Sequence, residues 1–399
     1  MPTIFRARWV LPIAQPPIAD GWVAVEDGRI LEVGAGPLPA GAPVQDIDGA
    51  ILPGLVNAHT HLELSWMRDQ VPPASTMPAW VESLMALRRT AGPEAPEPIL
   101  AAVHEARAAG TALVGDVTNT LAAYEPLASS GMLAAIFREL LGFNVPDPDG
   151  MVAAARTQID ALPRHPQLRA AVVPHAPYSV SPALLRSIAA ASGGAPISIH
   201  LGESAEEVEF LRSGLGAWRD LLGRLGAWSD AWQAPVVGPV GYIAAQGLVT
   251  DRLLAVHCVQ LTDAELGTLA DAGATVVTCP RSNRWTGAGV PPIERFYASG
   301  VRVAVGTDSL SSVEDLNLFE ELRLMRAIAP TVPAREILAS ATRHGADALG
   351  FGSELGTLEV GKRAELIAVR VPAATVDVEE YLLTGIEPSM ITWVVPSKP

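Results

Sequence analysis

The chain has 399 residues, more than one ordinary hydrophobic core accommodates, so we expect two domains or one large barrel with an appendage. A formal charge of −15 argues against nucleic acid or an anionic membrane surface as a partner. Hydrophobic residues make up 49% of the chain, yet no apolar run reaches the roughly 20 residues that span a bilayer. The composition therefore predicts a globular, well-buried protein, and the charge excludes partners more than it proposes one.

The N-terminal segment and the cysteines indicate where the protein resides. Residues 1–8 lack the long apolar stretch and the small-residue cleavage site of a signal peptide. The two cysteines, Cys258 and Cys279, lie in strand-like apolar runs and offer no disulfide framework. We therefore expect a cytoplasmic protein.

The first fifty residues read as short strands separated by turn signals such as Glu26-Asp27-Gly28. The expected strands are Thr3–Leu11, Gly21–Glu26, Arg29–Val33 and Val44–Asp48.

From residue 51 onward, apolar β-type runs alternate with helical stretches, the pattern of parallel strands joined by crossover helices. The eight runs are Ile51–Ala58, Thr111–Val117, Ala134–Leu140, Arg169–Pro174, Pro196–Leu201, Leu253–His257, Thr275–Cys279 and Val301–Gly306. Helices are expected at Ala79–Arg89, Glu97–Ala109, Pro182–Ala191 and Asp263–Ala272, among others. Eight such units predict an α/β fold, a (β/α)8 TIM barrel.

The C-terminal region returns to strands, with an exposed-edge strand within 361–369 and a last one near Met390–Val395. An isolated hairpin at either end of the chain would be marginally stable, so we expect these strands to join the N-terminal ones in a small β-sandwich. The predicted domains are residues 1–50 with 355–399 for the sandwich, and 51–354 for the barrel.

Histidines gather at the ends of predicted strands. His59 and His61 are two residues apart, so on a strand they project from the same face. The other strand-end residues are His175, His200, His257 and Asp308. Because the C-terminal ends of barrel strands meet at the active-site mouth, these side chains are expected to converge. His104, His165 and His344 lie elsewhere and are interpreted as structural.

The set His59-Thr60-His61, His200, His257 and Asp308, on strands 1, 5, 6 and 8, resembles the amidohydrolase superfamily. The chain is most similar to its mononuclear aminohydrolases, which deaminate nucleobases and adenosine-type nucleosides. The shared blocks are Pro174-His175-Ala176-Pro177-Tyr178-Ser179, His200-Leu201-Gly202-Glu203, Cys279-Pro280-Arg281-Ser282-Asn283 and Gly306-Thr307-Asp308-Ser309.

The lysine content bears on the number of metal ions. Binuclear members of the superfamily commonly bridge two metals with a carboxylated lysine at the end of strand 4. Here the only lysines are Lys362 and Lys398, and strand 4 ends at His175. A lysine-bridged metal pair is thus excluded, and one divalent ion is expected.

The resemblance implies a role for each site residue. His59, His61, His200 and Asp308 would bind the metal; three imidazoles and a carboxylate suit Zn²⁺ first, with Fe²⁺ as the alternative. Glu203 would shuttle a proton from water to the ring nitrogen of the substrate. His257 would orient the water and stabilise the tetrahedral intermediate, with Asp308 assisting as a base.

Substrate-binding residues are expected after strand 1, at strand 3 and at strand 4. A tryptophan can stack on a purine, a glutamate can hold ribose hydroxyls, and an arginine can pair with a substrate carboxylate. The candidates are His175, Glu63, Trp66, Arg68, Trp80, Glu82, Arg138 and Asn283. The tryptophan-rich segment with Trp218, Trp228 and Trp232 is interpreted as a cap over the mouth, or alternatively as a packing or subunit contact.

Several blocks look closest to the aminodeoxyfutalosine deaminases of menaquinone biosynthesis, among them His59-Thr60-His61-Leu62-Glu63-Leu64-Ser65. The substrate of that group is an adenosine joined through its 5′ carbon to a benzoate. S-adenosylhomocysteine-type deaminases usually carry Pro-Met where this chain has Glu63-Leu64. The alternatives are an S-adenosylhomocysteine or methylthioadenosine deaminase, another nucleobase deaminase, a triazine-type chlorohydrolase, and an inactive structural barrel. A homodimer is left open.

Overall fold

The computed structural model describes residues 1–39, 41–90 and 96–395, so Lys398 lies outside the described residues. Two four-stranded parallel sheets form the centre of the molecule, in the orders β5-β6-β7-β8 and β12-β11-β10-β9. Their strands are β5 Leu55–Thr60, β6 Thr111–Thr118, β7 Leu133–Leu140, β8 Leu168–Pro174, β9 Ile197–Leu201, β10 Leu253–His257, β11 Thr275–Thr278 and β12 Arg302–Val305.

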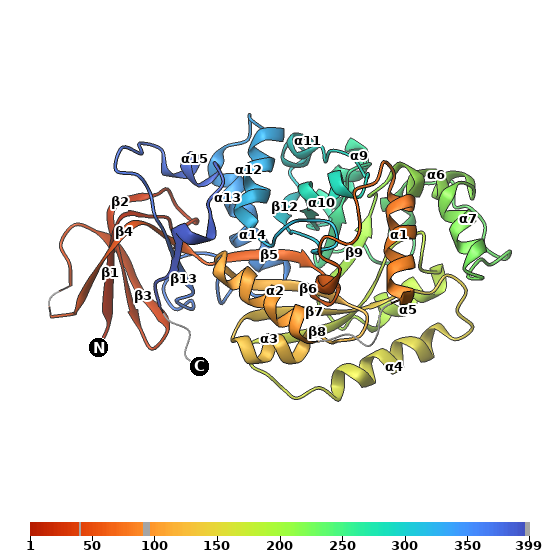
Figure 1. Ribbon diagram of the computed structural model, residues 1–399, viewed down its shortest axis with the longest axis horizontal. Coiled ribbons are helices and arrows are strands. Elements are labelled where there is room, and N and C mark those ends of the chain that lie inside the picture. Colours follow the sequence, from red (N-terminus) through yellow and green to blue (C-terminus); the bar gives the residue numbers. More distant parts are fainter. Residues whose placement is uncertain (40, 91–95, 396–399) are drawn as a thin grey trace.

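The two sheets meet along two seams near the C-terminal ends of their strands. At one seam, the backbone N–H of His200 donates to the carbonyl of His175 at 2.9 Å. At the other, the N–H of Asp308 donates to the carbonyl of His59 at 3.0 Å. Helices surround the sheets (Figure 1), and the predicted TIM-barrel architecture is confirmed.

The helices follow the strands as crossover elements. Some of them begin at a side-chain cap: Ser181 accepts from the backbone N–H of Leu184 ahead of α5, and Thr262 forms a capping box with Glu265 ahead of α9. None of the helices in the described ranges is long and apolar enough to cross a membrane.

The helices are η1 Leu62–Met67, α1 Met77–Thr90, α2 Pro96–Ala108, α3 Tyr124–Ser130, α4 Pro148–Asp160, α5 Pro182–Ala191, α6 Ala205–Ser213, α7 Ala217–Arg224, α8 Pro239–Ala244, α9 Asp263–Asp271, α10 Pro280–Trp285, α11 Ile293–Ala298, α12 Leu318–Ile328, α13 Ala334–Ser340, α14 Arg343–Ala348, α15 Val378–Leu382 and η2 Pro388–Met390.

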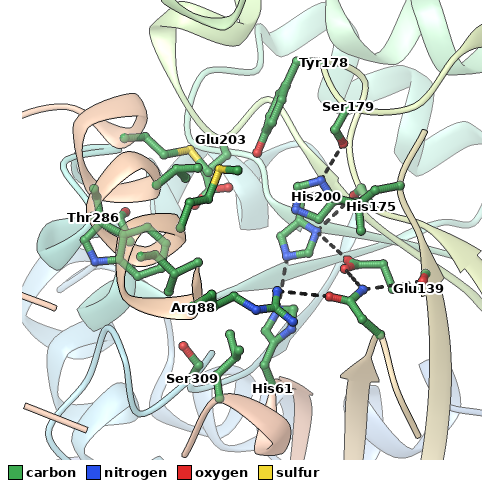
Figure 2. Close-up of a pocket in the computed structure, with 18 of the residues that line it drawn as sticks. His61, Arg88, Glu139, His175, Tyr178, Ser179, His200, Glu203, Thr286 and Ser309 are labelled. Atoms are coloured by element: carbon green, nitrogen blue, oxygen red, sulfur yellow. Dashed lines mark hydrogen bonds and ion pairs between the residues drawn. The ribbon is translucent and has the colours of Figure 1, made fainter. Parts of the chain in front are cut away.

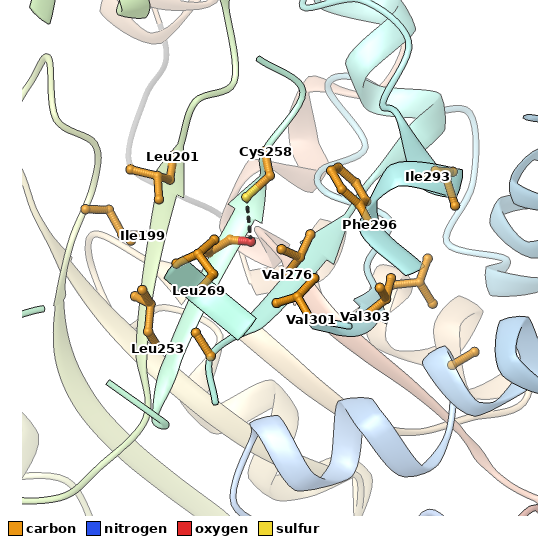
Figure 3. Close-up of a cluster of buried hydrophobic side chains, with 14 of the residues drawn as sticks. Ile199, Leu201, Leu253, Cys258, Leu269, Val276, Ile293, Phe296, Val301 and Val303 are labelled. Carbon is orange, nitrogen blue, oxygen red and sulfur yellow. Dashed lines mark hydrogen bonds between the residues drawn. The ribbon is translucent and has the colours of Figure 1, made fainter. Parts of the chain in front are cut away.

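The core has two layers because successive strand residues point to opposite faces. Alternate residues such as Val56, Leu254 and Val277 meet in one cluster drawn from both sheets, which is the barrel interior. The other faces pack against the helices: Figure 3 shows Ile199, Leu253 and Val276 together with Leu269 of α9 and with Ile293 and Phe296 of α11. This packing fixes the strand ends on which the site is built.

The N- and C-terminal strands form one six-stranded mixed sheet beside the barrel, in the order β14-β13-β4-β1-β2-β3. One detail differs from the expectation: the segment predicted as an edge strand, β13, lies between β14 and β4, and all four of its residues are buried. The six strands are β1 Thr3–Val10, β2 Ile18–Glu26, β3 Arg29–Ala35, β4 Val44–Pro53, β13 Leu366–Val369 and β14 Ile391–Trp393.

The chain passes from this sheet into the barrel at Gly54. The single strand expected at Ile51–Ala58 is in fact the end of β4 and the start of β5. A Cβ at Gly54 would lie 2.6 Å from the Cβ of Ala112, so only glycine fits this crossing. A single residue thus joins the terminal six-stranded sheet to the barrel, and His59 and His61 follow at the end of β5.

Candidate active site

His59 and His61 stand at the end of β5, where its ladder with β6 is irregular between Asn57 and Thr60. Irregularities of this kind redirect side chains at barrel rims. Thr60, between the two histidines, donates through its hydroxyl to the carbonyl of Asp308 at 3.0 Å. The irregular ladder and this hydrogen bond fix the two imidazoles relative to the end of β12.

His257 and Asp308 occupy left-handed backbone conformations, with φ of 72° and 63°. Such conformations are costly for residues other than glycine and occur where the surrounding structure enforces them. At His257 the turn directly follows Val256, whose side chain faces the barrel interior, so regular alternation would have sent the imidazole outward. The strained turns bring both side chains to the mouth.

The predicted metal ligands converge on one point. The Nε2 atoms of His61 and His200 are 3.3 Å apart, and Asp308 Oδ1 lies 3.6 Å from His61 Nε2 and 3.8 Å from His59 Nε2. Burial lowers the pKa of His59 and of His200 well below the usual histidine range, and the neighbouring imidazoles lower it further. Neutral imidazoles are the form that binds metal.

The donor set fits a single divalent cation. Neither ring nitrogen of the buried His59 has a hydrogen-bond partner among the described residues. His200 Nδ1 lies 3.0 Å from the carbonyl of His175, which accepts its proton and leaves Nε2 free as a ligand. Three imidazole nitrogens and one carboxylate leave an open position of the kind found in catalytic zinc sites.

Glu203 lies beside this set, 2% exposed, with its Oε1 3.6 Å from His257 Nε2. Burial raises the pKa of the Glu203 carboxyl well above its usual range, and the negative charges of Asp308 and Glu207 raise it further. A carboxyl group with a raised pKa can hold a proton near neutral pH and pass it on.

Glu207 was not recognised as functional from the sequence, where its run of glutamates resembles a solvated loop. It is fully buried and accepts from the backbone N–H groups of Gly202 and Glu203 at 2.9 and 3.2 Å. Glu207 therefore holds the loop that carries Glu203. The available signal was the Ser204-x-x-Glu207 spacing of a helix start, since Ser204 caps α6.

A pocket of about 410 Å³ opens above these groups. His61, His175, His200, Glu139 and Glu203 line its polar part (Figure 2). Its outer walls are apolar and come from two helices: Met77, Trp80, Val81, Leu84 and Met85 of α1, and Trp218, Leu221 and Leu222 of α7. Helix α7 of the tryptophan-rich segment thus borders the mouth. Trp228 and Trp232 instead pack on Phe143 and Phe210.

Three of the predicted substrate residues line this pocket: His175, Trp80 and Glu63. Glu63, however, is 1% exposed and accepts hydrogen bonds from the hydroxyls and backbone N–H groups of residues 118–120. Both of its carboxylate oxygens accept hydrogen bonds, so Glu63 braces the loop after β6; its role in substrate binding stays a prediction.

The other five predicted substrate residues do not line the pocket, and their role in substrate binding stays a prediction. Trp66 packs in the apolar cluster with Leu64 and Met67. Arg68 forms an ion pair with Glu105, and Glu82 of α1 forms one with Arg224 of α7.

Arg138 and Asn283 contact other side chains in the structure. Arg138 alternates with Glu139 along β7, so Glu139 faces the pocket while Arg138 turns outward and bonds Gln158 of α4. Asn283 is fully buried and contacts His257 Nδ1 at 2.9 Å, so it acts on a neighbouring histidine instead of on the substrate.

The structure adds pocket residues that the sequence did not single out, notably Arg88, Asn119 and Tyr178. Arg88 reaches from the last turn of α1 and lies 3.4 Å from Asn119 Oδ1 and 3.9 Å from Glu63 Oε1 (Figure 2). Tyr178 is 4% exposed, and its hydroxyl has no hydrogen-bond partner among the described residues. Its ring stacks on that of Trp218, with the ring centroids 3.9 Å apart. The sequence pattern alone does not show which residue of a helix points into the barrel mouth.

Glu139 also lines the pocket, with Oε2 bonded by Asn119 at 2.9 Å and Oε1 3.7 Å from His200 Nδ1. Burial raises the pKa of Glu139 to about 7. The polar part of the pocket therefore offers several protonatable groups next to one cation site, an arrangement suited to hydrolysis with proton transfer.

Comparison with known proteins agrees with this geometry. The Amidohydrolase family profile matches residues 50–389. A 5-methylthioadenosine/S-adenosylhomocysteine deaminase of Moorella thermoacetica is 33% identical over 382 residues, covering 90% of this chain and 83% of that protein. An aminodeoxyfutalosine deaminase of Deinococcus radiodurans is 33% identical over 316 residues, covering 76% and 74%.

Among solved structures, an adenosine deaminase of Xanthomonas campestris with bound zinc superimposes with a TM-score of 0.82 at 28% identity, over 98% of this chain and 90% of that one. The match thus extends over both the barrel and the terminal sheet. The resemblance read from the sequence is confirmed: the chain belongs to the amidohydrolase family.

Proposed function

We propose that the protein is a single-metal hydrolase that deaminates the purine ring of a 5′-substituted adenosine. The observation that carries this proposal is the two-part pocket, with a polar floor beside the metal ligands and apolar walls from α1 and α7. Adenosine alone would leave those walls exposed to water. An apolar group on the 5′ carbon would cover them and gain binding energy in proportion to the apolar area buried.

Chemistry at the floor follows from the residues present. A divalent ion held by His59, His61, His200 and Asp308 would lower the pKa of a water molecule. Glu203 accepts a proton from that water and delivers it to the ring nitrogen adjacent to C6. The water oxygen bonds to C6, and the proton remaining on it passes to the exocyclic amine with Asp308 and Glu203 as bases. The C6–N bond then breaks and ammonia leaves. His257 donates a hydrogen bond to the attacking oxygen, and Asp308 assists as a base.

Zinc is the proposed metal, with Fe²⁺ as the alternative. The ligand chemistry suits both ions, and the Xanthomonas campestris relative holds zinc. Elemental analysis of protein purified without added metal distinguishes them, with one equivalent of zinc expected per chain.

The preferred substrate is 6-amino-6-deoxyfutalosine, which would be converted to futalosine in menaquinone biosynthesis. Its 5′ benzoate is an apolar ring that ends in a carboxylate. Further along α1, after the residues of the apolar wall, Arg88 and Arg89 of its last turn also line the pocket. An arginine next to apolar surface suits such a group. The similarity to the Deinococcus radiodurans protein supports the same choice.

A methylthioadenosine or S-adenosylhomocysteine deaminase is the second candidate. The Moorella thermoacetica relative of that name aligns over a larger share of the chain, 90% against 76%. The Glu63-Leu64 departure no longer weighs against it, because Glu63 is engaged in bracing residues 118–120.

A substrate panel tests both candidates. Ammonia release would be measured with 6-amino-6-deoxyfutalosine, methylthioadenosine, S-adenosylhomocysteine, adenosine, guanine, cytosine and a chlorinated triazine. We expect kcat/KM for the best 5′-substituted adenosine to exceed that for adenosine by about tenfold or more, the size of effect that one well-filled apolar subsite supplies. Failure of every 5′-substituted adenosine would contradict the proposal, and turnover of the triazine alone would replace it.

A further inference from the structure

The short helix α10 contacts two groups of the reaction centre from one turn. Ser282 donates through its hydroxyl to Asp308 Oδ2 at 2.6 Å. Asn283, the next residue, places its side-chain amide nitrogen 2.9 Å from His257 Nδ1. Ser282 and Asn283 are fully buried and His257 is 1% exposed, so water does not compete for either contact.

Hydrogen bonds of its own backbone and an ion pair of Arg281, in the same turn, fix the position of Asn283. Its N–H donates to the carbonyl of Cys279 at 3.0 Å, and its own carbonyl accepts from the N–H of Gly289 at 3.1 Å. Arg281 ties this turn to α12 through Glu321 at 2.7 Å. The amide is therefore presented to His257 by a rigid support.

The second ring nitrogen of His257 has a different environment. Its Nε2 is buried without a hydrogen-bond partner in the described part of the chain, and it faces Glu203 Oε1 at 3.6 Å. The same imidazole lies close enough to His59 and His200 for the three to form a metal-binding group, with ligand atoms within 4.8 Å of one another. His257 could therefore either donate a hydrogen bond or bind the cation, depending on where its proton is.

A neutral imidazole carries one N–H, and the hydrogen bond at one nitrogen decides which nitrogen carries it. When the Asn283 NH₂ group donates to Nδ1, that nitrogen is an acceptor and the proton must be on Nε2. Rotating the amide by 180° would reverse the assignment, because its oxygen would then accept from an Nδ1–H. In the structure the amide nitrogen of Asn283 faces His257 Nδ1.

We propose that Asn283 is a positioning residue that holds His257 in its Nε2–H tautomer. In that form His257 donates a hydrogen bond toward Glu203 and the attacking water, and its Nε2 is unavailable as an additional metal ligand. This inference rests on the proposed function for its catalytic meaning. The tautomer itself is a property of the folded chain that can be measured without metal or substrate.

Nitrogen NMR of the metal-free protein labelled with ¹⁵N-histidine tests the proposal directly. Long-range ¹H–¹⁵N correlations distinguish the Nε2–H, Nδ1–H and doubly protonated rings, and a His257→Gln variant assigns the signal. We expect the Nε2–H pattern for His257 in the unmodified chain. An Nδ1–H pattern there would overturn the proposal, whatever the identity of the substrate.

The variant N283D gives the matched second measurement, because aspartate has the same shape but can only accept a hydrogen bond at Nδ1 when ionised. We expect the Nε2–H pattern to be lost and kcat to fall about 10- to 100-fold with KM changed less than about threefold, as is typical when a residue that orients a catalytic histidine is altered. In S282A the His257 pattern should be unchanged, because that hydroxyl contacts Asp308. An N283D protein that keeps both the Nε2–H pattern and its kcat would overturn the proposal.

Discussion

In the proposed reaction, proton transfer depends on Glu203, which is buried, has a pKa raised by burial, and lies 3.6 Å from His257 Nε2. Glu203→Gln preserves its shape but removes the proton shuttle. We expect kcat to fall by about 10²- to 10⁴-fold with an unchanged metal content, measured by ammonia release and elemental analysis. Glu209→Gln, an exposed neighbour on α6, is the control and should keep full turnover. A Glu203→Gln enzyme with normal kcat would remove Glu203 from the reaction.

His200 should act on metal binding, because its Nε2 stands 3.3 Å from that of His61 within the ligand set. His200→Ala removes one of four proposed ligands, and we expect less than about one tenth of the metal content of the unmodified protein after dialysis. His104→Ala, at an exposed position of α2, should retain the ion. Retention of a full equivalent by His200→Ala would contradict the ligand assignment.

Two arginines allow a matched test of substrate charge. Arg88 lines the pocket, whereas Arg138 bonds Gln158 of α4 outside it. We expect Arg88→Ala to lower kcat/KM about 10- to 100-fold for a 5′ substituent with a carboxylate, as befits one charged hydrogen bond, but less for methylthioadenosine. Arg138→Ala should affect both substrates equally and weakly. Equal losses on both substrates in Arg88→Ala would show that Arg88 only supports Asn119 and Glu63.

At the scale of elements, α10 depends on a buried ion pair. Arg281 bonds Glu321 at 2.7 Å and Asp315 at 2.8 Å, and the Glu321 side chain is fully buried. Arg281→Ala removes the positive charge that pairs with this carboxylate and leaves it only the backbone N–H of residue 281, so we expect the free energy of unfolding to fall by about 3–5 kcal/mol. Arg323→Ala, which removes the exposed Arg323–Glu320 pair of the same α12, should cost less than about 1 kcal/mol. Thermal unfolding of both variants makes the comparison, and equal losses would contradict it.

The elements that could be predicted are those specified by local pattern. Leu253–His257 and Pro182–Ala191 agree with β10 and α5 to the residue, because runs of strand-forming residues and a Ser-Pro helix start are local signals. The break at Gly54 and the inner place of β13 were missed, since both depend on contacts with distant segments, the Cβ of Ala112 and strand β14. Local sequence contains no record of either contact.

At the scale of the whole molecule, the clustering of the proposed metal ligands was predictable because barrel topology brings all strand ends together. Once the strands were placed, His59, His200 and Asp308 had to meet, and the structure places them together. The substrate residues were less predictable. Whether Arg138 or Glu139 enters the pocket depends on which of these neighbouring residues of β7 faces the barrel interior. Whether Arg88 enters it depends on how α1 crosses the barrel mouth.

The metal site should also contribute to the stability of the whole barrel, because its ligands come from both four-stranded sheets. Ion binding to the folded state alone stabilises it by about 4 kcal/mol at a free concentration 1,000 times Kd. We therefore expect chelation to lower the melting temperature by roughly 5–10 °C, and stoichiometric zinc to restore it. His200→Ala is the control, since chelator should shift its melting temperature little. If the metal-free protein melted at the same temperature as the loaded one, the ion would not join the two halves of the barrel, and the ligand set drawn from β5, β9 and the end of β12 would be wrong.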